Sequence, residues 1–95
     1  MHFIVHCQDK PGMVDTRLAH YDAHKAYLGT QPIDIIISGP LVQDDGTTMI
    51  GSFFLVQADT REEVETFNAN DPFHAAGIWQ QVLIHPFIKR MDKRS

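Results

Sequence analysis

The chain has 95 residues, of which 43% are hydrophobic and 21% charged, as expected for one ordinary globular domain spanning residues 1–95. A formal net charge of −4, with no basic stripe, argues against nucleic acid as a partner. No apolar run approaches the roughly 18 residues of a membrane-spanning helix, and no signal peptide is recognisable, so we expect a cytoplasmic protein without a membrane partner.

The first third of the chain predicts a strand followed by a helix. The β-rich run at residues 2–8 contains the lone Cys7, which we expect to be a small core residue in a reducing environment. The breaker "DKPG" ends this strand. A helix is predicted from about Met13 to Leu28, with Gly29 as its C-cap.

The middle of the chain predicts two strands joined by a turn. An apolar, β-branched run predicts a strand from about Ile33 to Ser38, broken at Gly39-Pro40. A turn at residues 44–46 leads into a second strand at about 47–58. That second strand is apolar on both alternations, so we expect both faces of the sheet to be buried.

The last third predicts a helix, a short helical turn and a closing strand. Asp59 or Thr60 is the expected N-cap of the helix, which buries Val64 and Phe67. The segment "NDPFHAAG" predicts the helical turn. A strand of about ten residues lies within residues 78–90.

The element order β-α-β-β-α-β predicts a ferredoxin-like α+β fold, in which two helices cover one face of an antiparallel four-stranded sheet. The other face has no cover within the chain. Because large exposed apolar faces mark association surfaces, we expect a homodimer in which two sheets face each other. Phe87, near the end of the closing strand, should be buried near the seam.

Two polar side chains interrupt the apolar face of the helix predicted at residues 13–28. At about 100° per residue, Arg17 and His24 fall into the apolar arc. A charge or an imidazole that faces the core costs several kcal/mol unless it is paired or opens onto a cavity. This helix therefore carries either a satisfied structural pair or the wall of a site. The apolar arc consists of Met13, Val14, Leu18, Tyr21 and Leu28.

The segment "NDPFHAAG" offers a partner for His24. Asp71, Pro72 and Gly77 have the chemistry of the N-cap, first and C′ positions of a one-turn helix. The Asp71 carboxylate could also accept a hydrogen bond from one imidazole nitrogen and leave the other free as a base. Arg17 needs an anion, which either Asp71 or a substrate oxygen could supply.

The six histidines raise the question of a metal site. His20 and His24 lie four residues apart on the predicted helix, and His2 and His6 share one face of the first strand. The glutamate of an HExxH motif is missing, and no third ligand has a recognisable spacing. We therefore expect neither a metal nor a cofactor, and a metal-dependent protein remains an alternative.

Five short motifs, in the same order along nearly the whole chain, resemble those of the YciI-like family. The family's members are small, cytoplasmic, ferredoxin-like proteins that form dimeric α+β barrels. Tyr21 and Asp22 stand where the family often has arginine and proline, and Ser38 replaces a residue that is often small and apolar, which predicts a specialised pocket. The motifs are "QDK" at 8–10, Arg17 with "AHKAYL" at 23–28, "SGPL" at 38–41, "NDPFHAAGIW" at 70–79 and "IHPFIK" at 84–89.

This resemblance implies that His24 and Asp71 form an active pair without a cofactor. One known activity of the family is dehydrochlorination of a chlorinated hydroxyhydroquinone in the degradation of aromatic compounds, and the superfamily also holds muconolactone isomerases. A lyase or isomerase acting on a small oxygenated, quinol-like substrate is therefore expected. The alternative is a non-catalytic small-molecule-binding or accessory module with a structural Arg-His-Asp network. The implied substrate contacts are Arg17, Ser38, Gly39, Pro40 and Phe73.

Overall fold

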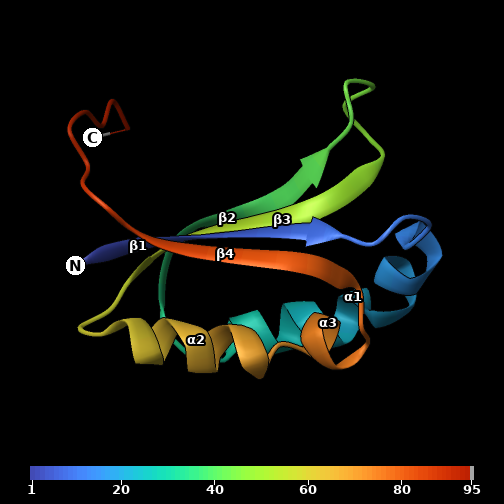
Figure 1. Ribbon diagram of the computed structural model, residues 1–95, viewed down its shortest axis with the longest axis horizontal. Coiled ribbons are helices and arrows are strands. Elements are labelled where there is room, and N and C mark those ends of the chain that lie inside the picture. Colours follow the sequence, from blue (N-terminus) through green and yellow to red (C-terminus); the bar gives the residue numbers. More distant parts are fainter. Residues whose placement is uncertain (95) are drawn as a thin grey trace.

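The computed structural model describes residues 1–94, which form a four-stranded antiparallel sheet with all helices on one side (Figure 1). This arrangement confirms the predicted ferredoxin-like α+β fold. No helix within residues 1–94 has the length and apolar character to cross a bilayer. The elements are β1 (His2–Asp9), α1 (Val14–Gly29), β2 (Asp34–Val42), β3 (Met49–Gln57), α2 (Arg61–Ala69), α3 (Pro72–Ala75) and β4 (Trp79–Phe87), with the strands in the order β2-β3-β1-β4.

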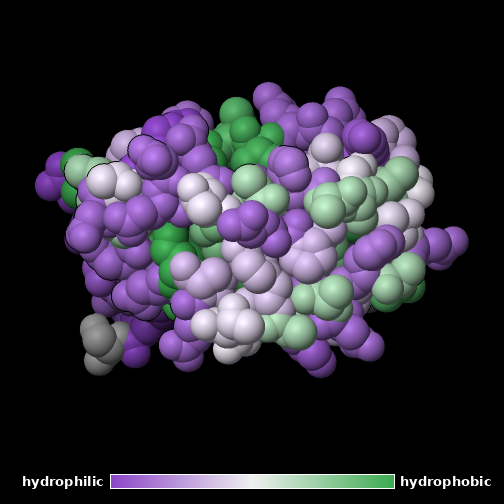
Figure 2. Space-filling model, turned by 90° about the horizontal axis from the view of Figure 1, so that it is seen from below, coloured by the Kyte–Doolittle hydropathy of each residue, from purple (hydrophilic) through white to green (hydrophobic). Residues whose placement is uncertain are grey.

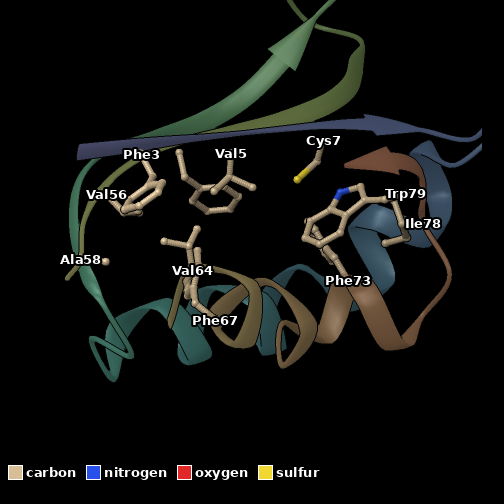
Figure 3. Packing of buried hydrophobic residues seen from close by; sticks show 11 residues of the cluster. Phe3, Val5, Cys7, Val56, Ala58, Val64, Phe67, Phe73, Ile78 and Trp79 are labelled. Carbon is tan, nitrogen blue, oxygen red and sulfur yellow. The ribbon is translucent and has the colours of Figure 1, made fainter. Parts of the chain in front are cut away.

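The hydrophobic core lies between the sheet and the helices. Alternate residues of β1, namely Phe3, Val5 and Cys7, are buried on the helix side, as the twofold period of a strand requires. Figure 3 shows these side chains above Val64 and Phe67 of α2, the two residues that the helical pattern predicts to be buried. Burial of Cys7 confirms the prediction that the lone cysteine is a core residue.

In the described part of the chain, residues 1–94, the opposite face of the sheet carries no helix (Figure 1). The strand register places apolar and histidine side chains on this surface, which we call the open sheet face. Leu55 is buried there by its neighbours, whereas Leu83 and Phe87 are each 39% exposed. Within one chain this face is therefore only partly covered. Its residues include His2, Ile4, His6, Ile37, Phe53, Leu55, Leu83, His85 and Phe87.

Helix α1 is rotated about its axis relative to the sequence-based expectation. It buries Arg17 and His24, whereas Val14, Leu18 and Tyr21 of the predicted buried arc are exposed by 36, 59 and 46%. The prediction of a buried apolar arc was wrong for these three residues, because the two polar side chains find partners beside the sheet and draw their side of the helix inward, whereas Met13 and Leu28 do pack against the core. The helix side of the molecule accordingly mixes hydrophilic surface with small hydrophobic groups (Figure 2).

Two element boundaries also differ from the prediction. Strand β2 does not stop at Ser38 but continues through Pro40, because β2 is an edge strand, where a residue without an N–H is tolerated. Gly29 is not the C-cap of α1. Thr30 takes that position and donates from its N–H and its Oγ1 to the Tyr27 carbonyl. The next residue, Gln31, donates to the Leu28 carbonyl and has a left-handed backbone, with φ 55°.

The predicted caps of the two later helices are confirmed. Thr60 Oγ1 accepts a hydrogen bond from the Glu63 N–H at the start of α2, at 3.3 Å. At the start of α3, Asp71 Oδ1 accepts one from the Phe73 N–H at 2.9 Å. Gly77 follows α3 with φ 70°, a left-handed conformation that glycine adopts readily. Local sequence therefore holds Asp71 and Phe73 in place.

Candidate active site

A cavity of about 290 Å³ lies between α1, α3 and the strands β2 and β3. It is at the lower limit of the usual size of small-molecule pockets, about 300–1,000 Å³. Asp71 lies behind His24 rather than in the cavity wall. The structure thus brings together most of the residues that the sequence predicts for a site. Those in the wall are Arg17, His24, Ser38, Gly39, Pro40 and Phe73.

The centre of this site is a buried hydrogen bond between His24 and Asp71. Nδ1 of His24 lies 2.8 Å from Oδ1 of Asp71, and Asp71 is only 1% exposed. Because an ionised carboxylate can only accept hydrogen bonds, this contact favours the His24 tautomer in which Nδ1 carries the proton. Within residues 1–94 no group bonds Nε2, so the other side of the imidazole is left as a base.

Aromatic rings fix the orientation of the imidazole. The rings of His24 and Phe73 are stacked, with centroids 4.0 Å apart and planes 2° apart. Phe54 of β3 meets the His24 ring edge-on, at 6.3 Å between centroids. Figure 3 shows Phe73 rising from α3 beside Trp79, whose ring lies edge-on to it. The imidazole therefore has little freedom to turn away from the cavity.

The buried anion that partners Arg17 is Asp9, at the end of β1. Nε of Arg17 donates to Asp9 Oδ2 at 2.5 Å, and both side chains are 4% exposed. Nη2 donates to the Gly51 carbonyl and to Ser52 Oγ. Asp71, one of the two anions suggested for Arg17, bonds His24 instead, and a contact between Arg17 and a substrate oxygen stays a prediction. Within the described residues Nη1 has no partner, although Arg17 lines the cavity.

Sequence reasoning missed Ser52 in this wall, and it missed Asp9, which lies outside the wall and bonds Arg17. Asp9 and Ser52 gain their importance only from the pairing of β1 with β3 beside α1, which no local pattern shows. The sequence did carry one indication of this contact. An aspartate ends the apolar run of β1, within reach of an arginine that is buried on the next helix. The remaining wall and mouth of the cavity are formed by Tyr21, Lys25, Leu28, Met49 and Phe54.

A larger hollow of about 790 Å³ lies elsewhere, between the C-terminal end of α1 and α2. Its lining is acidic, with Asp34, Asp59, Glu62 and Glu63. It is open to solvent and contains no histidine. We place the candidate site at the smaller cavity because the paired histidine and the buried arginine face that one.

Two other groups with possible chemistry lie outside the cavity wall. Burial raises the pKa of the Cys7 thiol to about 12, against the opposing effect of a hydrogen bond from Asn68, so this thiol stays protonated at neutral pH. Nδ1 of His20 contacts the Thr16 carbonyl oxygen at 3.0 Å. Within residues 1–94 no three or more histidine, cysteine or acidic side chains gather as a metal-binding group.

The fold and this cavity define a small α+β protein with a buried histidine–aspartate pair. A model of the YCII-related domain matches residues 1–88, and the chain therefore belongs to that family. It is 26% identical over 96 residues to an uncharacterized protein of Haemophilus influenzae and to protein YciI of Escherichia coli. Each match covers 94% of this chain and 98% of the relative.

Among solved structures, the chain is similar to 5-chloro-2-hydroxyhydroquinone dehydrochlorinase (TftG) from Burkholderia phenoliruptrix AC1100, in complex with 2,5-dihydroxybenzoquinone. The two chains are 33% identical, with a TM-score of 0.83. The match covers 93% of this chain and 94% of TftG. The likeness therefore extends over nearly the whole fold.

Proposed function

We propose that this protein is a cofactor-free enzyme that uses His24 and Asp71 for acid/base chemistry on a small hydroxylated ring, such as the dehydrochlorination of a chlorinated hydroxyhydroquinone. The observation that carries the proposal is that Nε2 of His24 has no partner among residues 1–94 and faces the cavity, while Nδ1 is held by a buried carboxylate. The dehydrochlorinase activity of the similar protein TftG supports the choice of substrate class.

In the proposed reaction, Nε2 of His24 takes the proton of a ring hydroxyl. Asp71 keeps the imidazole in position and stabilises the imidazolium that forms. The free Nη1 of Arg17 donates a hydrogen bond to the oxygen on which negative charge develops. Positioned proton transfer of this kind is typically worth about 10²- to 10⁴-fold in rate.

The remaining steps balance without an oxidant. The electron pair of the broken O–H bond moves into the ring, and the carbon that bears chlorine takes up a proton and becomes tetrahedral. A second hydroxyl then loses its proton, and the carbon–chlorine bond breaks with its electron pair leaving as chloride. The ring ends as a hydroxyquinone, and the sum is the loss of one HCl.

One observation favours the alternative of a binding or accessory module. Arg17 already makes hydrogen bonds to Asp9, Gly51 and Ser52, so part of the polar cluster serves the fold itself. Urea unfolding of His24→Ala distinguishes the two functions. A purely structural network predicts a loss of a few kcal/mol, whereas a catalytic histidine predicts a small change, because active-site groups are commonly not optimised for stability.

Turnover of 5-chloro-2-hydroxyhydroquinone under argon tests the proposal. Chloride release and the ultraviolet absorbance of the quinone are followed together, and the protein should accelerate both equally over buffer. Asp71→Asn should lower the rate by about 10-fold or more because the imidazole loses its ionised partner. Asp22→Asn, an exposed acid of α1, serves as the control and should keep the full rate. Equal rates of chloride release with and without the wild-type protein would refute the proposal that this compound is a substrate.

A further inference from the structure

The buried charges around the cavity are unequal in number. Arg17 is one buried cation, and Asp9 and Asp71 are two buried carboxylates. Asp9 Oδ1 and Asp71 Oδ2 have no hydrogen-bond partner within the described residues. By formal charge, Arg17, Asp9 and Asp71 together therefore carry one more negative charge than positive charge. Charges that are removed from water act on a ligand much more strongly than exposed charges do.

The other cation at the cavity, Lys25, is exposed at its mouth. Its Nζ lies 5.3 Å from the centroid of the Tyr21 ring, and solvent and salt screen its charge. Arg17 would attract an anion if it stood alone. Asp9 lies 2.5 Å from its Nε, however, and offsets the guanidinium charge. The guanidinium thus keeps one free donor nitrogen and loses most of its attraction for a full negative charge.

We propose that this cluster makes the cavity select an uncharged hydroxylated ring over the same ring bearing a carboxylate, and that Asp9 is the positioning residue that sets this preference. The inference rests on the proposed function, because it concerns the substrate of the same cavity. A carboxylate on the ring would lose its hydration beside a neutralised arginine and two buried acids. A neutral ring hydroxyl accepts a hydrogen bond from Nη1 of Arg17 and gives its proton to Nε2 of His24. Such a ring brings no net charge into the cavity when it binds.

Binding of two matched ligands tests the preference in the wild-type protein. Methylhydroquinone and 2,5-dihydroxybenzoate share the dihydroxybenzene ring and differ in a methyl group against a carboxylate. Calorimetric titration under argon should give at least about tenfold tighter binding of methylhydroquinone. Equal or tighter binding of the carboxylate would overturn the proposal. Because neither ligand turns over, a failure of dehydrochlorination leaves this test intact.

Asp9→Asn tests the role of Asp9. The variant keeps the side-chain shape but leaves the Arg17 charge unopposed, so 2,5-dihydroxybenzoate should bind at least about tenfold more tightly than it binds the wild-type protein. Methylhydroquinone should stay within about threefold. Asp15→Asn, an exposed acid in the first turn of α1, changes the net charge equally and should alter neither ligand. An unchanged ligand preference in folded Asp9→Asn would refute the role of Asp9.

A double variant covers the case in which Asp9→Asn does not fold. Asp9→Leu with Arg17→Met removes both members of the pair, a replacement that buried ion pairs often tolerate. Because the pair adds no net charge, the ratio of the two affinities should stay within about threefold of the wild-type ratio. A selective loss of affinity for 2,5-dihydroxybenzoate would mean that Arg17 attracts the carboxylate in the wild-type protein, and would contradict the proposal.

Discussion

The imidazole of His24 lies flat against the ring of Phe73, 4.0 Å away between centroids and within 2° of parallel. Phe73 stands two residues after Asp71, and its own N–H bonds the same carboxylate oxygen that holds His24. The short helix α3 therefore supplies both the hydrogen bond and the stacking surface that orient the histidine.

Replacement of Phe73 by leucine should therefore impair activity as well as stability. We expect a loss of about 1–3 kcal/mol in the free energy of unfolding, because the side chain is fully buried, and a fall of roughly tenfold in the rate of chloride release. Phe67→Leu is the matched control, because Phe67 is also buried but, within residues 1–94, its ring pairs with Tyr27 and Phe54 and not with His24. It should lose similar stability with an unchanged rate. Equal rates for the two variants would contradict a role of Phe73 in orienting His24.

Gly51 should tolerate no side chain. A Cβ at this position would lie 2.3 Å from the Cys7 carbonyl oxygen, so Gly51→Ala forces the central strands β1 and β3 apart. We expect a loss of about 2 kcal/mol or more in the free energy of unfolding, measured in urea. Gly39→Ala is the control, because its Cβ meets nothing within 4 Å, and it should change stability by less than about 1 kcal/mol. Similar losses in both variants would contradict this close approach.

The stability of the protein should fall in alkali. Burial raises the pKa of Cys7 from 9.0 to about 12 and also raises the pKa of Tyr27, so the folded state holds protons that the unfolded chain releases. The free energy of unfolding is therefore highest below about pH 9 and decreases as the pH rises toward 12, by up to about 1.4 kcal/mol per pH unit for Cys7. Urea titrations at several pH values should show a shallower decrease for Cys7→Ala. The same slope in both proteins would contradict the assignment to Cys7.

The open sheet face should pair with a second copy of the chain. Apolar surface of several hundred Å² is rarely left exposed on monomers, and its burial is worth about 25 cal/mol per Å². Sedimentation at low micromolar concentration should give twice the chain mass of 10.8 kDa. Leu83→Glu on this face should yield monomers, whereas Leu18→Glu on exposed α1 should not. A wild-type monomer with an intact fold would contradict the dimer.

The element order and the caps could be predicted because their signals are local. Thr60 precedes two glutamates, and Asp71 precedes a proline, so each marks a helix start without reference to the rest of the fold. The pairing of His24 with Asp71 was within reach because a buried imidazole needs a partner. The segment around Asp71 already offered that partner from the sequence, and the family resemblance pointed to the same pair.

The partner of Arg17 could not be predicted in the same way. Asp9 meets Arg17 only because α1 packs its polar side against the sheet, and that orientation depends on the whole fold. The same packing exposes Leu18 and Tyr21, which a helical wheel assigns to the core. Strand β2 runs past Pro40 because it is an edge strand, a position that emerges only from the assembled sheet.

The most direct test of the account compares the rates of chloride release from 5-chloro-2-hydroxyhydroquinone by the His24→Ala and His20→Ala proteins. Both variants lose one histidine from α1, but only His24 faces the cavity and bonds Asp71. We predict that His24→Ala is slower than wild type by about 10²-fold or more, while His20→Ala keeps the wild-type rate. A folded His24→Ala protein that releases chloride at the wild-type rate would contradict the central claim that His24 is the base.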